Sequence, residues 1–172
     1  MQMNTRRVVV LPYDGAWRDD FLKIKSELQA ALGGLALGIE HVGSTAVPGL
    51  SAKPIIDIDV VIADAALLGA VIAALRGIGY RHEGDLGIAG REAFDYEGKP
   101  HLRRHHLYVC PRDSAELKRH VAFRDYLRAH PEAVRAYSRI KEEGAALYPN
   151  DIEGYIEHKS PLIERIYREI GL

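Results

Sequence analysis

The chain has little cysteine and no long apolar segment. Its 172 residues include one cysteine, Cys110, so no disulfide can form within the chain. No apolar run approaches the roughly 20 residues that a membrane-spanning helix requires. The N-terminal residues also lack the apolar segment and small-residue cleavage site of a signal peptide. These absences predict a cytoplasmic protein without a membrane partner.

The chain also lacks an excess of either charge. Its 23 Lys and Arg residues nearly balance 24 Asp and Glu residues, which gives a formal net charge of −1 at pH 7. A balanced chain has no strong field to attract a long polyanion. The composition therefore favours a small-molecule partner over nucleic acid, without indicating an oligomeric state.

The predicted elements change from mixed to all-helical along the chain. One apolar stripe at helical spacing favours a helix from about residue 15 to Leu32; it consists of Trp17, Phe21, Ile24, Leu28 and Ala31. The later pattern predicts strands at 35–42 and 54–62, a helix in 63–80, two strands within 91–110 around a Gly-Lys-Pro turn, and helices from about 113, 131 and 151. We expect one domain over 1–172, with an α+β core in about 1–112 and a helical bundle in about 113–172.

Three details of the helical part are predicted from individual residues. Asp113 and Glu116 resemble a capping box at a helix start. Pro131 suits the first turn of the next helix. Pro161 lies inside the last helical pattern and is expected to kink or restart that helix.

The segment PIIDIDVVI places two carboxylates in an otherwise apolar strand. Side chains two residues apart on a strand share a face, so Asp57 and Asp59 are expected to lie together. Neighbouring carboxylates repel each other and are costly to bury. Mg²⁺ resolves both problems, since it prefers oxygen ligands and is satisfied by one or two carboxylates with substrate phosphates. The alternative is a solvated sheet end, or ion pairs with Arg or Lys.

The loop before this strand contains Gly43, Ser44 and Thr45. Glycine allows a close backbone approach to a ligand, and the two hydroxyls with their amides can hold phosphate oxygens. An ordinary turn is the alternative. His41 precedes the loop and either orients it or packs in the core.

Taken together, these residues resemble a known family. The Gly-Ser pair followed by a strand with DID resembles the nucleotidyltransferase superfamily, which has the DNA-polymerase-β-like fold. The longer segments IEHVGSTAVPGLSAKPIIDIDVVI, FRDYLRAHPEAVRAYSRIK and YIEHKSPLI resemble the GrpB family. The resemblance implies an α+β fold: a minimal nucleotidyltransferase core, in which a mixed β-sheet carries helices on one face, plus the C-terminal helical bundle.

The resemblance also implies roles for individual residues. Gly43 and Ser44 match the glycine-serine pair, and Asp57 and Asp59 match the two metal-binding acids. The superfamily usually adds a third acid on a later strand, but the matching strand, HHLYVC, has none. His106 is expected to occupy that position, either as a base or as a metal ligand, although Mg²⁺ prefers oxygen. Glu92 is a second candidate for the position.

Helical periodicity places one cation on the apolar face of each C-terminal helix. These cations are Arg124, Lys141 and Lys159. Buried cations are rarely left unpaired, so the three predict a shared anionic target. That target is either the aspartate pair, in a structural ion-pair network, or a bound triphosphate.

Other basic side chains have separate interpretations. Lys53 and Arg91 are further candidates for phosphate binding. Arg103 and Arg104 are expected in a solvated turn. The histidines of HLRRHH do not predict a zinc site, because a strand sends neighbouring side chains to opposite faces and no cysteine cluster accompanies them.

The sequence thus supports two hypotheses. In the first, the protein uses Mg²⁺ or Mn²⁺ to transfer a nucleotidyl group from a nucleoside triphosphate to an unknown small-molecule acceptor. In the second, the same pocket binds a nucleotide or phosphorylated metabolite without catalysis.

Overall fold

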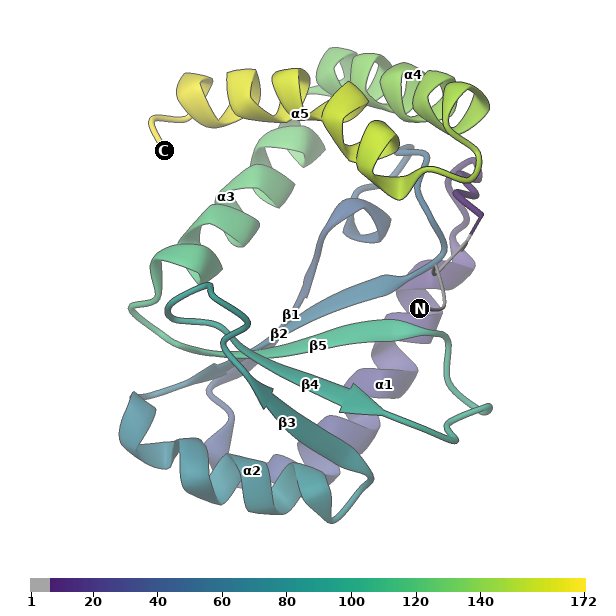
Figure 1. The fold of residues 1–172 in the computed structure, drawn as a ribbon. Coiled ribbons are helices and arrows are strands. Elements are labelled where there is room, and N and C mark those ends of the chain that lie inside the picture. The colour runs from purple at the N-terminus through teal and green to yellow at the C-terminus, as the bar shows by residue number, and fades with distance from the viewer. Residues whose placement is uncertain (1–6) are drawn as a thin grey trace.

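The computed structural model describes residues 7–172, which form an α+β fold with one five-stranded mixed sheet (Figure 1). The helices and strands are α1 (Ala16–Leu32), β1 (Gly38–Val42), β2 (Ile56–Ile62), α2 (Leu68–Arg76), β3 (Tyr80–Gly84), β4 (Glu92–Tyr96), β5 (His105–Pro111), α3 (Ala115–Ala129), α4 (Pro131–Leu147) and α5 (Ile152–Glu169). The strand order is β1-β2-β5-β4-β3, and among these five strands β2 and β5 form the one parallel pair. In this described part, no helix is both long and apolar enough to cross a membrane.

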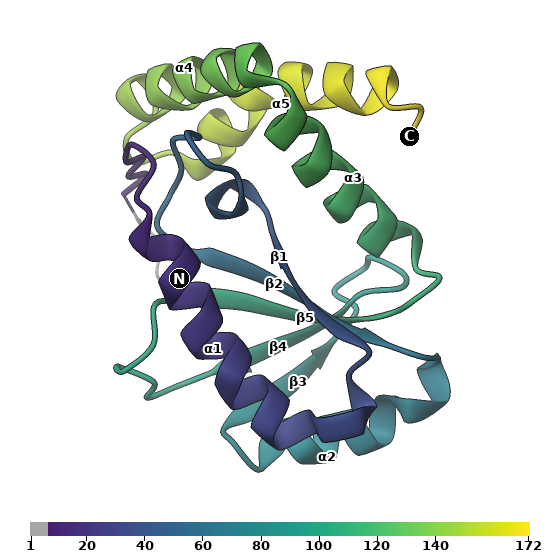
Figure 2. The same ribbon diagram turned by 180° about the vertical axis from the view of Figure 1, so that it is seen from behind.

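Helices α1 and α2 cover one face of the sheet. Figure 2 shows α1 crossing the strands, with α2 near one end of the sheet. The predicted stripe on α1 is confirmed at four positions, which are buried; the last contact comes from Leu32, while Ala31 is half-buried. The core under these helices includes Ile56, Ile58 and Val60 of β2. Alternate residues of β2 therefore point to the opposite face.

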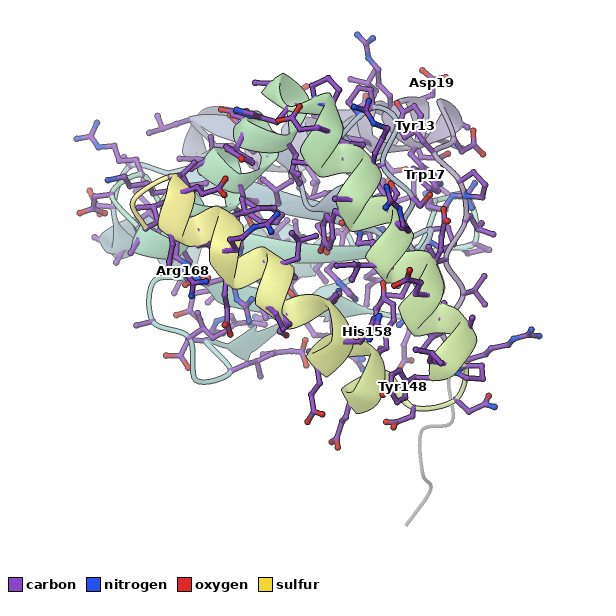
Figure 3. The ribbon with its side chains drawn as sticks, turned by 90° about the horizontal axis from the view of Figure 1, so that it is seen from above. Tyr13, Trp17, Asp19, Tyr148, His158 and Arg168 are labelled. Carbon is purple, nitrogen blue, oxygen red and sulfur yellow. The ribbon has the colours of Figure 1, made fainter. Side chains whose placement is uncertain are left out.

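Helices α3, α4 and α5 lie on that opposite side, and α4 and α5 run side by side above the sheet (Figures 1 and 3). They form a second apolar core with Val47 and Leu50, which belong to the loop between β1 and β2. The loop therefore both connects two strands of the sheet and packs against the C-terminal helices. A mixed sheet with helices on one face and a C-terminal bundle was expected from the resemblance, and both are confirmed.

Several details differ from the sequence expectations. Strand β3 was missed because its middle residues are exposed at the sheet edge and carry no apolar alternation. Helix α3 is capped by Ser114, whose Oγ accepts a hydrogen bond from the Leu117 amide, and not by Asp113. Helix α5 is continuous through Pro161, so of the two expected outcomes, a kink or a restart, the restart does not occur. Pro131 does occupy the first turn of α4.

Candidate functional site

The two aspartates of β2 lie on the face that looks toward the C-terminal helices. The Asp57 side chain is 33% exposed, whereas Asp59 is fully buried. Strand pairing sets His106 of β5 beside Asp57 and Tyr108 beside Asp59. This face of β5 therefore presents an imidazole and a phenol next to the two acids, and no carboxylate.

Each aspartate is paired with a histidine. His106 Nδ1 lies 3.0 Å from Asp57 Oδ1, and His120 Nδ1 of α3 lies 2.6 Å from Asp59 Oδ2. The other carboxylate oxygen of Asp59, Oδ1, is buried and has no hydrogen-bond partner among the described residues. A buried acceptor without a donor is costly, and a bound cation would satisfy it.

Burial and pairing act in opposite directions on the Asp59–His120 pair. Burial raises the pKa of Asp59, and the hydrogen bond from His120 offsets part of that rise. Burial lowers the pKa of His120, but the hydrogen bond and charge of Asp59 outweigh it, so the pKa of His120 is raised. The imidazole therefore keeps its proton to a higher pH than an ordinary histidine.

The Gly-Ser loop lies directly against Asp57. Gly43 has a φ of 73°, a conformation that L side chains rarely adopt, and a Cβ built there would overlap the Asp57 carboxylate. Only glycine lets the backbone come this close. Residues Ser44–Ala46 form a short 3₁₀ turn.

Both hydroxyls of the turn are held by neighbouring side chains. Ser44 Oγ accepts a hydrogen bond from Lys141 Nζ of α4. Thr45 Oγ1 lies 2.9 Å from His41 Nε2, and both residues are buried. The His41 ring also stacks on Phe21, with 4.6 Å between ring centroids. His41 thus both packs in the core and contacts the loop, so it does what each alternative required.

A cavity of about 200 Å³ lies beside the Gly-Ser loop. We call it the lysine cavity; it is lined by Ser44, Thr45, Ala52, Lys53, Ile55, Asp57, His106, Lys141, Tyr155 and Lys159. Its lysines come from three segments: the β1–β2 loop, α4 and α5. Lys159 Nζ lies 4.8 Å and Lys53 Nζ 5.8 Å from the centre of the Tyr155 ring.

The surroundings of the lysine cavity disfavour the charged form of all three lysines. Burial, together with the charges of Lys159 and Lys53, lowers the pKa of Lys141 well below its usual value. Burial and Lys53 lower the pKa of Lys159 to about 8. Burial also lowers the pKa of Lys53. Asp57 opposes all three shifts, and among residues 7–172 it is the one carboxylate that lines the cavity. The cavity is therefore suited to an additional anion.

Arg124 lies apart from the lysine cavity. Its Nη1 donates to Glu40 Oε2 at 2.7 Å and to the His41 carbonyl at 3.0 Å. The structure therefore brings together two of the three helix cations, and Arg124 instead ties α3 to β1. Glu92 is also outside the site. Its strand partner is Val109, which lies in the core beneath α1 and α2, and the Glu92 carboxylate pairs with His82. Sequence reasoning missed His120 and also Tyr155.

A second cavity of about 200 Å³ lies on the same side of the sheet. We call it the arginine cavity; it is lined by Val42, Gly43, Asp57, Arg91, Tyr108 and His120. Of the residues that the structure describes, Asp57 alone lines both cavities. Arg91 lies over the Tyr108 ring, with 4.2 Å from Cζ to the ring centre.

The residues present fit Mg²⁺ only in combination with a ligand. Among residues 7–172, no three His, Cys, Asp or Glu side chains gather into a metal-binding group. Two neighbouring carboxylates, one with an unpartnered oxygen, match the partial protein ligand set that Mg²⁺ uses with substrate phosphates and water. Asp57 and Asp59 would supply those carboxylate oxygens.

The fold is that of the nucleotidyltransferases. The Cid1 poly(U) polymerase, solved with MgGTP bound, superimposes with a TM-score of 0.55 and 10% identity over 76% of this chain and 43% of Cid1. At this identity the likeness concerns the fold alone. The crystal structure of GrpB from Enterococcus faecalis is much more similar, with a TM-score of 0.82 and 33% identity over 94% of this chain and 96% of that one.

The chain belongs to the GrpB protein family, whose pattern it matches over residues 7–169. It is 41% identical over 163 residues to the UPF0157 protein PA4798 of Pseudomonas aeruginosa, covering 93% of this chain and 66% of that protein. It is 34% identical over 159 residues to the UPF0157 protein YqkA of Bacillus subtilis, covering 92% of this chain. The chain spans 66% of the length of PA4798 and 46% of that of YqkA.

Proposed function

We propose that the protein is a Mg²⁺-dependent nucleotidyltransferase that moves a nucleotidyl group from a nucleoside triphosphate to a small-molecule acceptor. The observation that carries this proposal is the lysine cavity. Three lysines with lowered pKa values converge there beside Asp57 and the Gly-Ser loop. A bound triphosphate would supply negative charge to neutralise these three lysines, which among the described residues have only Asp57 as an anionic neighbour in the cavity.

The chain's own residues divide the work. Lys53, Lys141 and Lys159 bind the triphosphate by charge. Ser44 and Thr45 present their turn to its oxygens, and Gly43 lets the backbone approach. Asp57 and Asp59 would hold Mg²⁺, which would supply positive charge to neutralise the phosphates.

In the reaction, an oxygen of the acceptor forms a bond to the α-phosphorus. The bond from the α-phosphorus to its bridging oxygen breaks, and pyrophosphate leaves with that electron pair. The acceptor proton passes to His106, which stands beside Asp57 where a third carboxylate is usual in the superfamily. The lysines stabilise the charge that develops on the leaving pyrophosphate.

Pyrophosphate release tests this proposal. The protein is incubated with each of the four nucleoside triphosphates, Mg²⁺ or Mn²⁺, and a pool of small hydroxyl and phosphate acceptors. We expect release from the wild type, and loss of at least about a hundredfold in Asp57→Asn, since a metal ligand is removed. Asp19→Asn is the control, because Asp19 is an exposed residue of α1 (Figure 3). Release that survives in Asp57→Asn contradicts the proposal.

A second function has its own support. The acid-free face of β5 favours a protein that binds a nucleotide or phosphorylated metabolite without turnover. Calorimetry separates the two functions. Triphosphate binding that is lost in Lys141→Met, with no pyrophosphate released under any condition, supports the binding protein and rules out the transferase.

A further inference from the structure

Arg91 is a cation that the proposed chemistry does not use. Its Nε is buried without a hydrogen-bond partner among residues 7–172, and none of the carboxylates described there lies within ion-pair distance of it. Its guanidinium is positioned by the Tyr108 ring, 4.2 Å away. Arginine is normally paired when it leaves bulk water, because an unmet charged donor is costly. An arginine fixed in this way is available to a ligand.

The arginine cavity has the right place for a second substrate. Asp57 separates it from the lysine cavity and lines both. A group transfer at phosphorus needs donor and acceptor on either side of the reacting centre, within a few ångströms. If the phosphate groups of the nucleoside triphosphate occupy the lysine cavity, which has the same volume of about 200 Å³, an acceptor in the arginine cavity would meet them at Asp57.

We propose that the arginine cavity binds the acceptor and that Arg91 holds an anionic group on it, a phosphate or a carboxylate. That the bound molecule is the acceptor rests on the proposed function, whereas anion binding at Arg91 does not depend on it. The planar guanidinium fork matches the oxygens of both groups.

The dimensions of the cavity limit the acceptor. About 200 Å³ is smaller than the roughly 300–1,000 Å³ of an ordinary ligand pocket. It has room for an anionic group and a few neighbouring atoms, so the acceptor hydroxyl lies close to its charged group. The ligand class is therefore a small hydroxylated phosphate or hydroxy acid.

The test is an NMR titration of the ¹⁵N-labelled protein with inorganic phosphate and, separately, with acetate. We expect two sets of shifted amides, one around Lys141 and Lys159 in the lysine cavity and one around Val42 and Tyr108 in the arginine cavity. Arg91→Gln should weaken phosphate or acetate binding in the second set about tenfold, the loss expected for one charge-assisted hydrogen bond. Lys141→Met should affect only the first set. Acetate that matches phosphate indicates a carboxylate acceptor, and phosphate alone indicates a phosphorylated one.

Two further variants control the experiment. Arg91→Lys keeps the charge but not the fork, so it should bind more weakly than the wild type and more tightly than Arg91→Gln. Arg168→Gln removes an exposed arginine at the far end of α5 and should change neither set (Figure 3). Equal binding by Arg91→Gln and the wild type, or no shifts around Val42 and Tyr108, overturns the inference. Triphosphate binding is measured separately in Arg91→Gln and should stay within about twofold of the wild type, so its absence from both proteins counts against the proposed function alone.

Discussion

Gly43 lies directly against the Asp57 carboxylate. An added Cβ would overlap the Asp57 carboxylate and lie 3.0 Å from its Cγ, and the φ of 73° is strained for any other residue. We predict that Gly43→Ala displaces the Asp57 carboxylate and lowers affinity for Mg²⁺-triphosphate at least about tenfold. It should also reduce the free energy of unfolding by about 1–2 kcal/mol. Calorimetry and urea unfolding measure the two effects.

Gly98 provides the matched control for this change. It has a φ of 68°, but a Cβ there meets nothing within 4 Å. Gly98→Ala should therefore reproduce the loss of stability without the loss of affinity. Equal affinities in the two variants would mean that the contact with Asp57 is irrelevant to binding.

His41 makes a prediction about pH. Burial first, and then the charge of Arg128, lowers the pKa of His41 from 6.5 to about 4. Between pH 6.5 and 4 the unfolded state binds more protons than the folded state, so the stability due to neutral His41 is lost as the pH falls through this window. We predict that the wild type loses about 2 kcal/mol more than His41→Gln across it. Urea unfolding at pH 7, 5.5 and 4.5 measures this difference, with the exposed His101→Asn as control.

At the scale of elements, the α4–α5 hairpin determines how close the lysines approach. Gly144 of α4 faces Tyr155 and His158 of α5 so closely that an added Cβ would lie 3.1 Å from the Tyr155 ring. This approach brings Lys141 and Lys159 to the same cavity. The repulsion between these two lysines therefore depends on how closely α4 and α5 pack.

This crowding predicts a second pH dependence. With a pKa of about 8 when folded against about 10.5 when unfolded, Lys159 destabilises the folded state fully below pH 8, and this penalty disappears as the pH rises toward 10.5. We predict that Lys159→Met is about 2 kcal/mol more stable than the wild type at pH 7, and that the difference shrinks by pH 10. Urea unfolding at both pH values tests this. A gap that does not change with pH, or one equal to that of the exposed Lys118→Met, contradicts it.

The parts of the site that sequence could predict are those that depend on local spacing. Asp57 and Asp59 share a face because a strand alternates, and helical periodicity alone turned Lys141 and Lys159 inward. Arg124 obeys the same periodicity, yet it pairs with Glu40, because the partner of an inward cation depends on how α3 crosses β1. That crossing is a long-range contact.

His120 also shows that local spacing does not predict a long-range partner. It is one helical turn before Arg124 on the inner face of α3, so the spacing contained a signal for it. Its partner Asp59 is 61 residues away in the sequence. Strand β3 was missed for a different reason: an exposed edge strand need not show an apolar pattern.

At the scale of the whole molecule, the site lies between two apolar cores. One packs α1 and α2 on the sheet, and the other joins α3, α4 and α5 to the β1–β2 loop. Arg128 donates two hydrogen bonds to the Ala46 carbonyl, and Ser51 donates one to Glu142. The lysine cavity is lined by residues of the sheet and the β1–β2 loop and by residues of α4 and α5. A ligand there would contact both the sheet and the helical bundle and stabilise their packing.

We predict that Mg²⁺ with a non-hydrolysable triphosphate raises the melting temperature. At a concentration of about 100 times Kd, the gain is about 2.7 kcal/mol, or roughly 5–10 °C for a chain of this size. Lys141→Met should show no such rise, whereas Lys118→Met should behave as the wild type. An equal rise in both variants would mean that the nucleotide binds outside the lysine cavity.

The most direct test of the central claim is a crystal structure of the protein with Mg²⁺ and a non-hydrolysable nucleoside triphosphate. We expect the terminal phosphates to lie against Ser44, Lys141 and Lys159, with Mg²⁺ bound to Asp57 and Asp59. A triphosphate located elsewhere, or a lysine cavity filled only by water while nucleotide is bound at another surface, would contradict it.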